Sequence, residues 1–342
     1  GCMKTKKKAV IATSIIISLI IISSITISNP LLVDRAFYRM GFQEQICFPI
    51  IDKEFQSNNV LNIATAADFG INKNSIKTLA NIQSSDPEII LLVGDLGQST
   101  AEKWIESSKI IGKENVYIVL GDGDLPQEKQ KLREYYDLNN DYYSFDYENI
   151  HFLAVTPADL TLAERARGVS QETISNDKMQ LDFIRTDLKH ANDNPETDFT
   201  IVFMHLPMYS SIQYPFMDLR NELQPMFDLY GVDLVISGHQ HAYERTYPVM
   251  FNNAITDYEK CSYNNPDGQI YLTVGMGGHS HAKSEQKQPW SVIINHNDFG
   301  FLNIKLVNNG KTLYGEFTSN TGKIMDAFQI NLNSPQIENL EG

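Results

Sequence analysis

The sequence predicts an α/β fold in which a parallel sheet comes first and further strands follow. Short apolar runs of strand length alternate with segments of helical periodicity along the first two thirds of the chain. Three of these runs are followed by an aspartate close to glycine, and these residues, Asp68, Asp95 and Asp122, are spaced 27 residues apart. The carboxyl third is mostly strand-like.

The first three predicted strands, at residues 60–66, 88–93 and 116–120, have the β-α-β rhythm of a parallel sheet. Helices are expected between them, the first with an apolar face around Leu79. An Asp-Gly turn alone is common, but carboxylates after three consecutive parallel strands are expected to meet at one sheet edge. Like charges gathered there repel one another, and bound cations are the simplest remedy.

The middle of the chain continues this alternation. Residues 143–156 predict a β-hairpin, and a helix is predicted from about 176 to 190. The next buried strand, 199–204, ends at His205. This histidine therefore occupies the same kind of position as the three aspartates.

A predicted helix over 216–230 leads into the most informative stretch, the strand at 232–237 followed by Gly238, His239 and His241. Imidazole is the commonest nitrogen ligand of transition metals, and a loop at the carboxyl end of a strand can aim both rings into one cleft. The strand and the glycine before the histidines favour a metal site over two surface histidines.

The carboxyl third is expected to complete a second sheet packed on the first. Asn308-Asn309-Gly310 is a typical hairpin turn within it. Its main predicted strands cover residues 269–274, 300–307, 312–318 and 324–330.

The amino terminus has the pattern of a membrane anchor. Residues 1–8 form a basic cytoplasmic stub, and residues 9–27 form an uncharged run long enough to cross a bilayer. A cleaved signal peptide usually has a shorter core and a small-residue cleavage site, so an uncleaved anchor is favoured and a secreted form is the alternative. Residues 28–57 are then a linker, 58–332 an extracytoplasmic domain and 333–342 a polar tail.

Charge and cysteine content restrict the partners and the compartment. The formal net charge of -14 argues against nucleic acid, because phosphate backbones are bound by clustered Lys and Arg. A small phosphate ester is compatible with it, because metal ions in a cleft can meet the charge of the ester. Cys47 and Cys261 could form one disulfide in an exported domain, or remain two thiols. The oligomeric state is not determined.

The strand ends supply six candidate metal ligands. Mixed oxygen and nitrogen donors suit Mn, Fe or Zn, and six side chains are enough for two divalent or trivalent transition-metal ions that share a bridging carboxylate. Such a pair can activate a bridging water and clamp phosphoryl oxygens during in-line attack, so no nucleophilic side chain is needed. The candidates are Asp68, Asp95, Asp122, His205, His239 and His241.

These motifs resemble the calcineurin-like metallophosphoesterases, and in particular the purple acid phosphatase branch. The resemblance extends over about residues 60–330, and the Ala-Tyr-Glu-Arg after the last motif strengthens it. It implies a four-layer α/β/β/α sandwich of two mixed sheets flanked by helices. The motifs that carry it are Asp68-Phe69-Gly70, residues 94–98, residues 121–124, His205 and residues 238–241.

The resemblance also implies roles for the six ligands. Asp95 would bridge the two metal ions. Asp68 and His241 would bind the first ion, and Asp122, His205 and His239 the second. The implied activity is hydrolysis of phosphate esters by a metal-bound hydroxide.

Three residues depart from the family pattern. Gln98 stands where the family has a tyrosine ligand, and Asp122 replaces an asparagine ligand. Gly123 stands in place of a histidine thought to contact the phosphate and assist the leaving group, and general acid help of that kind is worth about 10²- to 10⁴-fold in rate. His279, in the loop after the strand at 269–274, is the candidate catalytic replacement. The alternative is that His279 is a solvent-exposed loop residue.

The sequence therefore predicts a membrane-anchored metallophosphoesterase with two metal ions and a small phosphate-ester substrate. The alternative is a metal- or phosphate-binding module that keeps the cluster but has lost turnover. Gly123 favours this alternative, and the six intact ligands oppose it. The sequence does not distinguish a monoester, a diester or a phosphoprotein as the substrate, and it does not identify the metals.

Overall fold

The computed structural model describes residues 61–156, 171–212, 215–256, 260–283 and 286–332. All of them belong to one structural unit, Phe48–Gly342. Within this described part, no helix combines the length and the apolar character that a membrane span requires. The predicted stub (1–8), anchor (9–27), linker (28–57) and tail (333–342) lie outside the described residues.

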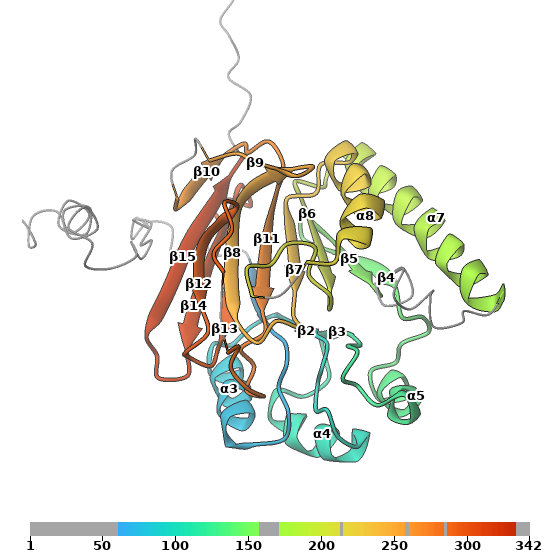
Figure 1. Cartoon of the computed structure of the whole chain (residues 1–342), viewed down its shortest axis with the longest axis vertical. Coiled ribbons are helices and arrows are strands. Elements are labelled where there is room, and N and C mark those ends of the chain that lie inside the picture. Colours follow the sequence, from blue (N-terminus) through green and yellow to red (C-terminus); the bar gives the residue numbers. More distant parts are fainter. Residues whose placement is uncertain (1–60, 157–170, 213–214, 257–259, 284–285, 333–342) are drawn as a thin grey trace, which may run out of the picture. The chain divides into compact units, whose positions relative to one another are not determined.

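The first sheet has seven strands in the order β10-β15-β14-β13-β1-β2-β3 (Figure 1). Its parallel part is the predicted array of β1 (Leu61–Ala66), β2 (Ile89–Val93) and β3 (Val116–Val119). The next strand, β13, pairs antiparallel with β1. The other strands are β13 (Gly300–Val307), β14 (Thr312–Ser319), β15 (Ile324–Asn331) and the short β10 (Ser262–Asn264).

The second sheet has the order β12-β8-β11-β7-β6-β5-β4, and β9 pairs with β8. Its centre is parallel and consists of β5 (Ile150–Val155), β6 (Phe199–Met204), β7 (Leu234–Ser237) and β11 (Gln269–Val274). Antiparallel strands complete both edges. They are β4 (Tyr143–Tyr147), β8 (Tyr243–Met250), β9 (Asn253–Ala254) and β12 (Ser291–Asn295).

Helices cover the outer faces of the two sheets, which gives four layers (Figure 1). On the first sheet lie α3 (Lys73–Ser84), α4 (Ala101–Ser108), the 3₁₀ turn η2 (Lys109–Ile111) and α5 (Pro126–Tyr135). On the second sheet lie α7 (Gln171–Asp193) and α8 (Met217–Leu229). The α/β sandwich of two mixed sheets is therefore confirmed.

The burial pattern of β1 explains why its sequence has apolar residues on both faces. Leu61 and Ile63 point into the core between the two sheets. Ala64 and Ala66 point to the opposite face and pack in the cluster under α3 and α4. Because side chains alternate along a strand, a strand covered on both faces has apolar residues on both of them and does not alternate between apolar and polar.

The predicted assignment of the carboxyl third to one second sheet is wrong. Only β11 of the four predicted strands joins the second sheet, while β13, β14 and β15 extend the first sheet through the pairing of β13 with β1. Sequence patterns also missed α5, β8 and β12. Strand pairing joins residues far apart in sequence, and local periodicity does not specify the partner.

Cys261, directly before β10, is disulfide-bonded. The predicted partner, Cys47, lies outside the described residues. The Cys47–Cys261 pairing therefore stays a prediction.

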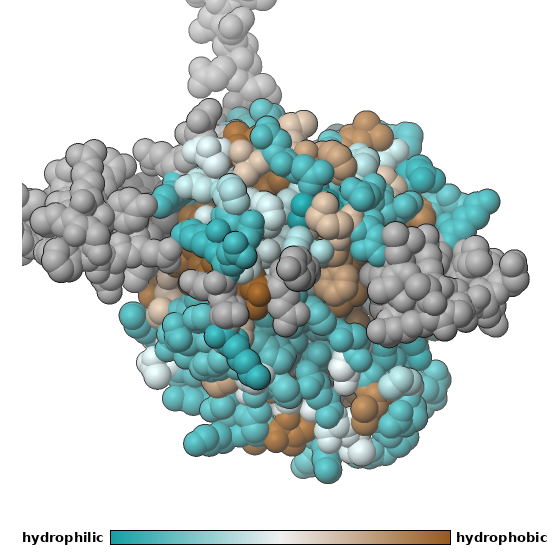
Figure 2. All heavy atoms as spheres, in the orientation of Figure 1, coloured by the Kyte–Doolittle hydropathy of each residue, from teal (hydrophilic) through white to brown (hydrophobic). Residues whose placement is uncertain are grey.

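The face of the molecule seen in Figure 2 is mostly hydrophilic where it is described, with only small separate apolar areas. Isolated exposed apolar side chains are normal on soluble domains and need no partner. The side chains that could carry chemistry lie at the strand ends instead.

Candidate metal centre

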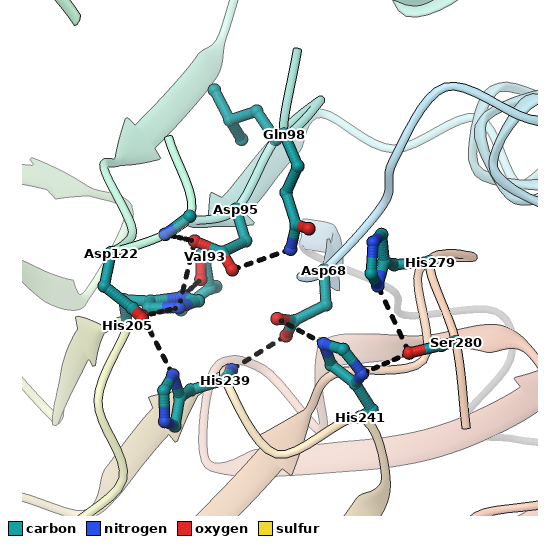
Figure 3. A network of polar contacts seen from close by, with 12 residues as sticks. Asp68, Val93, Asp95, Gln98, Asp122, His205, His239, His241, His279 and Ser280 are labelled. Carbon is teal, nitrogen blue, oxygen red and sulfur yellow. Dashed lines mark hydrogen bonds and ion pairs between the residues drawn. The ribbon is translucent and has the colours of Figure 1, made fainter. Parts of the chain in front are cut away.

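The six predicted ligands meet where both sheets present the carboxyl ends of parallel strands (Figure 3). The three aspartates follow β1, β2 and β3, the first histidine follows β6, and the last two follow β7. Backbone hydrogen bonds join the two sheets here, since Ala67 N donates to Val274 O at 3.0 Å. The residues brought together are Asp68, Asp95, Asp122, His205, His239 and His241.

The backbone of this centre is strained. Asp68, Asp95 and His239 have φ angles of 59°, 50° and 69°, a left-handed region that non-glycine residues rarely adopt. Such strain costs of order 1–3 kcal/mol per residue and tends to cluster at functional sites. At Gly94 (φ 82°) a side chain is excluded, because a Cβ atom would lie 2.4 Å from Nδ1 of His205.

His205 is buried and has one nitrogen fixed by the backbone. Its Nδ1 donates to the carbonyl oxygen of Val93 at 2.8 Å. Its Nε2 therefore faces the carboxylates, 3.3 Å from Asp95 Oδ1 and 3.1 Å from Asp122 Oδ1. Burial alone would lower the pKa of His205, but Asp122, Asp95 and Asp68 raise this pKa to about 10. A nitrogen in these surroundings holds a proton, or a cation in its place.

Asp95 lies at the centre of the cluster. One carboxylate oxygen accepts a hydrogen bond from Gly123 N at 2.7 Å, and the other accepts from the Gln98 side-chain amide at 2.8 Å. Burial raises the pKa of Asp95, and the negative charges of Asp68 and Asp122 add to the rise while His205 opposes it. The negative charge of ionised Asp95 is therefore only partly balanced by its neighbours. This is expected of a carboxylate that would bridge two metal ions.

The other ligands form two pairs on either side of Asp95. Asp122 Oδ1 lies 2.8 Å from His239 Nδ1. Burial opposes the shift, but contacts with His205 and His239 lower the pKa of Asp122. Asp68 is fully buried, and its Oδ2 accepts a hydrogen bond from the backbone N–H of His239 at 2.8 Å. Its Oδ1 lies 3.5 Å from His241 Nε2.

The donor set fits two cations. Among the described residues, two groups have ligand atoms within 4.8 Å of one another, Asp122-His205-His239 and Asp68-Asp95-His205. Within the described ranges, Asp68 Oδ1 and His205 Nε2 are buried atoms without a regular hydrogen bond. Asp68 Oδ1 lies 3.5 Å from His241, and His205 Nε2 lies 3.1 Å from Asp122, so each contacts only loosely another predicted ligand. A buried polar atom without a good hydrogen bond is costly, and a cation would satisfy both atoms. His205 enters both groups and His241 neither, so the proposed place of His241 on the first ion rests on its 3.5 Å approach to Asp68.

His279 lies next to this cluster, beyond the end of β11. Its backbone N–H donates to Asp68 O at 2.9 Å, and its ring centroid lies 5.0 Å from that of His241. Ser280 Oγ stands between the two rings, 2.5 Å from His241 Nδ1 and 3.2 Å from His279 Nδ1. Burial and the neighbouring His241 lower the pKa of His279. The predicted catalytic histidine is thus within reach of the predicted ligands.

Two family descriptions match the chain. The family "Calcineurin-like phosphoesterase" matches residues 61–243, which is more than half of the 342-residue chain. The chain belongs to the calcineurin-like phosphoesterase family. Residues 268–327 match "Iron/zinc purple acid phosphatase-like protein C", so the predicted purple acid phosphatase branch is confirmed. Membership in this family implies a dinuclear metal site.

Curated relatives include plant purple acid phosphatases. Purple acid phosphatase 18 of Arabidopsis thaliana is 26% identical over 84% of this chain and 66% of its own length. Probable inactive purple acid phosphatase 1 of the same plant is 36% identical, over 32% of this chain and 18% of its own. Purple acid phosphatase 23 is 22% identical, and this chain covers 59% of its length. The chain thus spans at most about two thirds of these relatives.

A solved structure shares the fold. The yellow lupin (Lupinus luteus) purple acid phosphatase PPD1 superposes with a TM-score of 0.67 at 22% identity, over 84% of this chain and 56% of that one. GAP50, described as the anchor in the inner membrane complex of Plasmodium, superposes with a TM-score of 0.63 at 19% identity, over 81% and 90%. Identities this low establish the fold alone.

Asp124 is the main residue of this phosphoesterase site that the motifs did not assign. It is buried, and its carboxylate accepts hydrogen bonds from Leu96 N (2.9 Å), Asp95 N (3.1 Å) and Gly121 N (2.8 Å). Burial raises its pKa to about 6, against these bonds. It joins the loops after β2 and β3 and so fixes Asp95 against Asp122. Its place as the last residue of the motif at 121–124 was the available signal.

Proposed function

We propose that the chain is a dinuclear metal-dependent phosphoesterase that hydrolyses small phosphate esters. The observation that carries the proposal is a pair of buried ligand atoms, Asp68 Oδ1 and His205 Nε2, that lack a regular hydrogen bond within the described part of the chain and lie among the six predicted ligands. A fold without a bound cation gains nothing from such an arrangement, since each unpaired buried group costs stability. Family membership supports the same activity.

The six ligands divide between two ions as the family resemblance implies. Asp68 and His241 would hold the first ion, Asp122, His205 and His239 would hold the second, and Asp95 would be shared by both. Two ions of Mn, Fe or Zn would supply Lewis-acid polarisation of the phosphoryl group and activation of water. The chain supplies the geometry. His205 is fixed in its tautomer by Val93 O, and Asp95 is oriented by Gly123 N and Gln98.

His279 is the group proposed to assist the leaving group. If His241 Nε2 binds a metal ion, the ring proton of neutral His241 would be on Nδ1 and would be donated in a hydrogen bond to Ser280 Oγ. The hydroxyl hydrogen of Ser280 is then free to be donated to His279 Nδ1. This leaves the hydrogen of a neutral His279 on Nε2, from where it can form a hydrogen bond to the leaving oxygen and stabilise the negative charge that develops there. If His279→Ala leaves kcat/KM for phenyl phosphate unchanged, this role is excluded.

A second candidate function is a binding module with little or no turnover. Gly123 favours it, because the family histidine is missing there and a Cβ atom at this position would lie 2.5 Å from Asp95 Oδ2. The approach is so close that adding a side chain requires Asp95 to move. A relative named as probably inactive is similar to part of this chain. The six intact ligands favour the enzyme.

The test measures metal content and turnover together. The protein is loaded with Mn²⁺, Fe or Zn²⁺ and given p-nitrophenyl phosphate and bis-p-nitrophenyl phosphate, with His239→Ala as the variant. His190→Ala, at an exposed histidine at the end of α7, is the matched control. Two metal ions per chain and turnover that His239→Ala alone abolishes are expected. Metal without turnover on either ester supports the binding module, and absence of metal overturns both functions.

A membrane-anchored, extracytoplasmic location is a further proposal, supported by the basic residues 1–8 and the apolar run 9–27. The test is extraction of membranes at alkaline pH from cells that express the whole chain or a chain that starts at residue 28. Retention of the whole chain and release of the shorter one are expected. Release of both excludes an anchor.

A further inference from the structure

A pocket of about 510 Å³ opens beside the predicted metal cluster. Its walls come from the turn after β1, the loop between β2 and α4, and His279. Its volume is within the range of small-molecule sites. Its polar lining residues include Gln98, Ser99, Lys103 and His279.

Two of these residues also contact the predicted metal ligands, so the pocket adjoins the cluster. Gln98 donates to Asp95 Oδ2 at 2.8 Å, and the backbone of His279 donates to Asp68 O at 2.9 Å. Figure 3 shows Gln98 and His279 on the side of Asp68 that faces away from His239. A phosphoryl group at the cluster would thus place its leaving group, which His279 is proposed to assist, in this pocket.

The pocket has a positive charge and no acidic lining residue. Lys103, exposed on the first turn of α4, is its cation, whereas Glu102 next to it is paired with Lys131 at 2.7 Å. Across the described ranges, neither the Lys103 ammonium nor the Ser99 hydroxyl has a hydrogen-bond or ion-pair partner. The chain has a net charge of -14, so many carboxylates are available to pair with a lysine. A lysine and a hydroxyl beside the cluster that have no partner in this described part are therefore available to a ligand.

We infer that this pocket binds a second anionic group on the leaving group of the substrate. The substrate class is a phosphate ester whose leaving group carries a carboxylate or a further phosphate, and Lys103 with Ser99 is the specificity-determining pair. The inference rests on the proposed function and specifies its substrate. A partly exposed charge pair changes the free energy by up to about 1 kcal/mol, so the expected preference is about two- to fivefold and decreases with salt.

The experiment compares the full chain with Lys103→Gln and with Lys77→Gln. Lys77 is an exposed lysine on α3 that does not line the pocket, and its substitution removes the same charge. The affinities of the Mn²⁺-loaded proteins for phenylphosphonate and 4-carboxyphenylphosphonate are measured by calorimetry. In parallel, kcat/KM is measured for phenyl phosphate, 4-carboxyphenyl phosphate and 4-phosphonophenyl phosphate. Ratios within one protein cancel the intrinsic reactivity of each ester.

The expected result is that the anionic substituent improves affinity and kcat/KM two- to fivefold more in the wild type and in Lys77→Gln than in Lys103→Gln. Comparison of the carboxylate ester with the phosphonate ester then identifies the preferred anion. Equal ratios in Lys103→Gln and the wild type overturn the inference. Loss of turnover on every ester in every protein overturns the proposed function instead, and the phosphonate affinities still decide the inference.

Discussion

Two buried charged clusters in this molecule are built in opposite ways. Arg245 on β8 and Asp326 on β15 are fully buried and join the two sheets. The guanidinium donates to both carboxylate oxygens, at 2.6 and 2.8 Å, and also to Tyr263 OH at 2.7 Å. Tyr243 OH donates to the same carboxylate at 2.8 Å. In this cluster the positive charge of Arg245 balances the negative charge of Asp326, and both side chains have hydrogen-bond partners. We call it the closed cluster.

The candidate metal centre is the open cluster. It contains three aspartates, and three of its predicted ligands have a left-handed backbone. Within the described residues, two of its buried polar atoms lack a regular hydrogen bond. Burial of charge alone therefore does not indicate function. The candidate metal centre differs from the other cluster in its shortage of positive charge and of hydrogen-bond donors, and bound cations can satisfy its negative charge and its free lone pairs.

The same Asp→Asn change in the two clusters gives the sharpest contrast, and Asp95→Asn has the largest expected effect on activity. The amide keeps the shape of the side chain but removes the carboxylate proposed to bridge the two metals. Turnover should fall by more than the roughly 100-fold that loss of an outer-shell partner costs. Metal analysis and assays with p-nitrophenyl phosphate measure this. In chelator, the free energy of unfolding should not fall, because one of several repelling carboxylates has been removed.

Asp326→Asn should do the reverse. It leaves the buried guanidinium of Arg245 without a counter-charge, and breaking one side of such a pair costs about 3–5 kcal/mol of the free energy of unfolding. Urea unfolding measures the loss, and the folded fraction should still bind metal. The double variant Arg245→Met/Asp326→Leu should recover most of the stability, since an apolar pair of similar volume is often neutral or better.

An exposed ion pair is the control for this second prediction. Glu106→Gln removes the partner of Lys109, where the two side chains are 72% and 63% exposed, and should leave the urea midpoint unchanged. If Asp326→Asn is as mild as Glu106→Gln, the cluster between the sheets is not the closed, structural one.

Ser280→Ala should have an intermediate effect. It removes the hydroxyl between His241 and His279, and loss of such an outer-shell partner typically costs 10- to 100-fold in metal affinity or activity. Ser280→Thr keeps the hydroxyl and should retain most activity. The double variant Ser280→Ala/His279→Ala tests whether both residues act together, since their effects on kcat should then be less than additive. Full additivity would contradict the proposed hydrogen-bond relay.

His151 lies in a third charged cluster, and its substitution should have the smallest effect of those considered, a change in the pH dependence of stability. Its Nδ1 is 2.7 Å from Asp146 and its Nε2 is 2.8 Å from Asp187. Burial opposes the shift, but these carboxylates raise the pKa of His151 above its usual value. The imidazolium therefore stabilises the fold below the unfolded pKa of about 6.5. This stability is lost as the pH rises through the higher folded pKa.

His151→Gln tests this in chelator by urea unfolding at pH 6 and pH 9. The variant should lose stability relative to the wild type at pH 6 and much less at pH 9. His190→Gln, at an exposed histidine of the same chain, should show no such pH dependence. A loss that is equal at both pH values would show that His151 acts by packing and not by charge.

The sequence predicted most of the elements that build the site, and the reason is local. The runs that became β1, β2, β3, β6 and β7 are apolar at nearly every position because both faces of each strand are covered. A polar residue directly after such a run must lie at the sheet edge. This position in the chain is enough to single out Asp68, Asp95, Asp122, His205 and His239 as candidate ligands.

Other elements could not be predicted from the sequence because their buried residues include charged ones. The strand β8 contains buried Glu244 and Arg245, and it resembles a polar loop until the partners of these residues are known. The Glu244 carboxylate accepts hydrogen bonds from the N–H and the hydroxyl of Ser211, at 2.7 and 2.6 Å. Arg245 forms an ion pair with Asp326. Buried charge is tolerated only when it is paired, and the pairing joins residues far apart in the chain.

By itself the sequence determined the family, the parallel array of β1, β2 and β3, and the six predicted ligands, because short-range patterns and motifs carry that information. Only the tertiary structure decided that β13–β15 extend the first sheet, that Asp124 fixes Asp95 against Asp122 and that Ser280 lies between His241 and His279. These are contacts between segments distant in sequence. Their geometry depends on how two sheets pack and not on any local preference of the residues that make them.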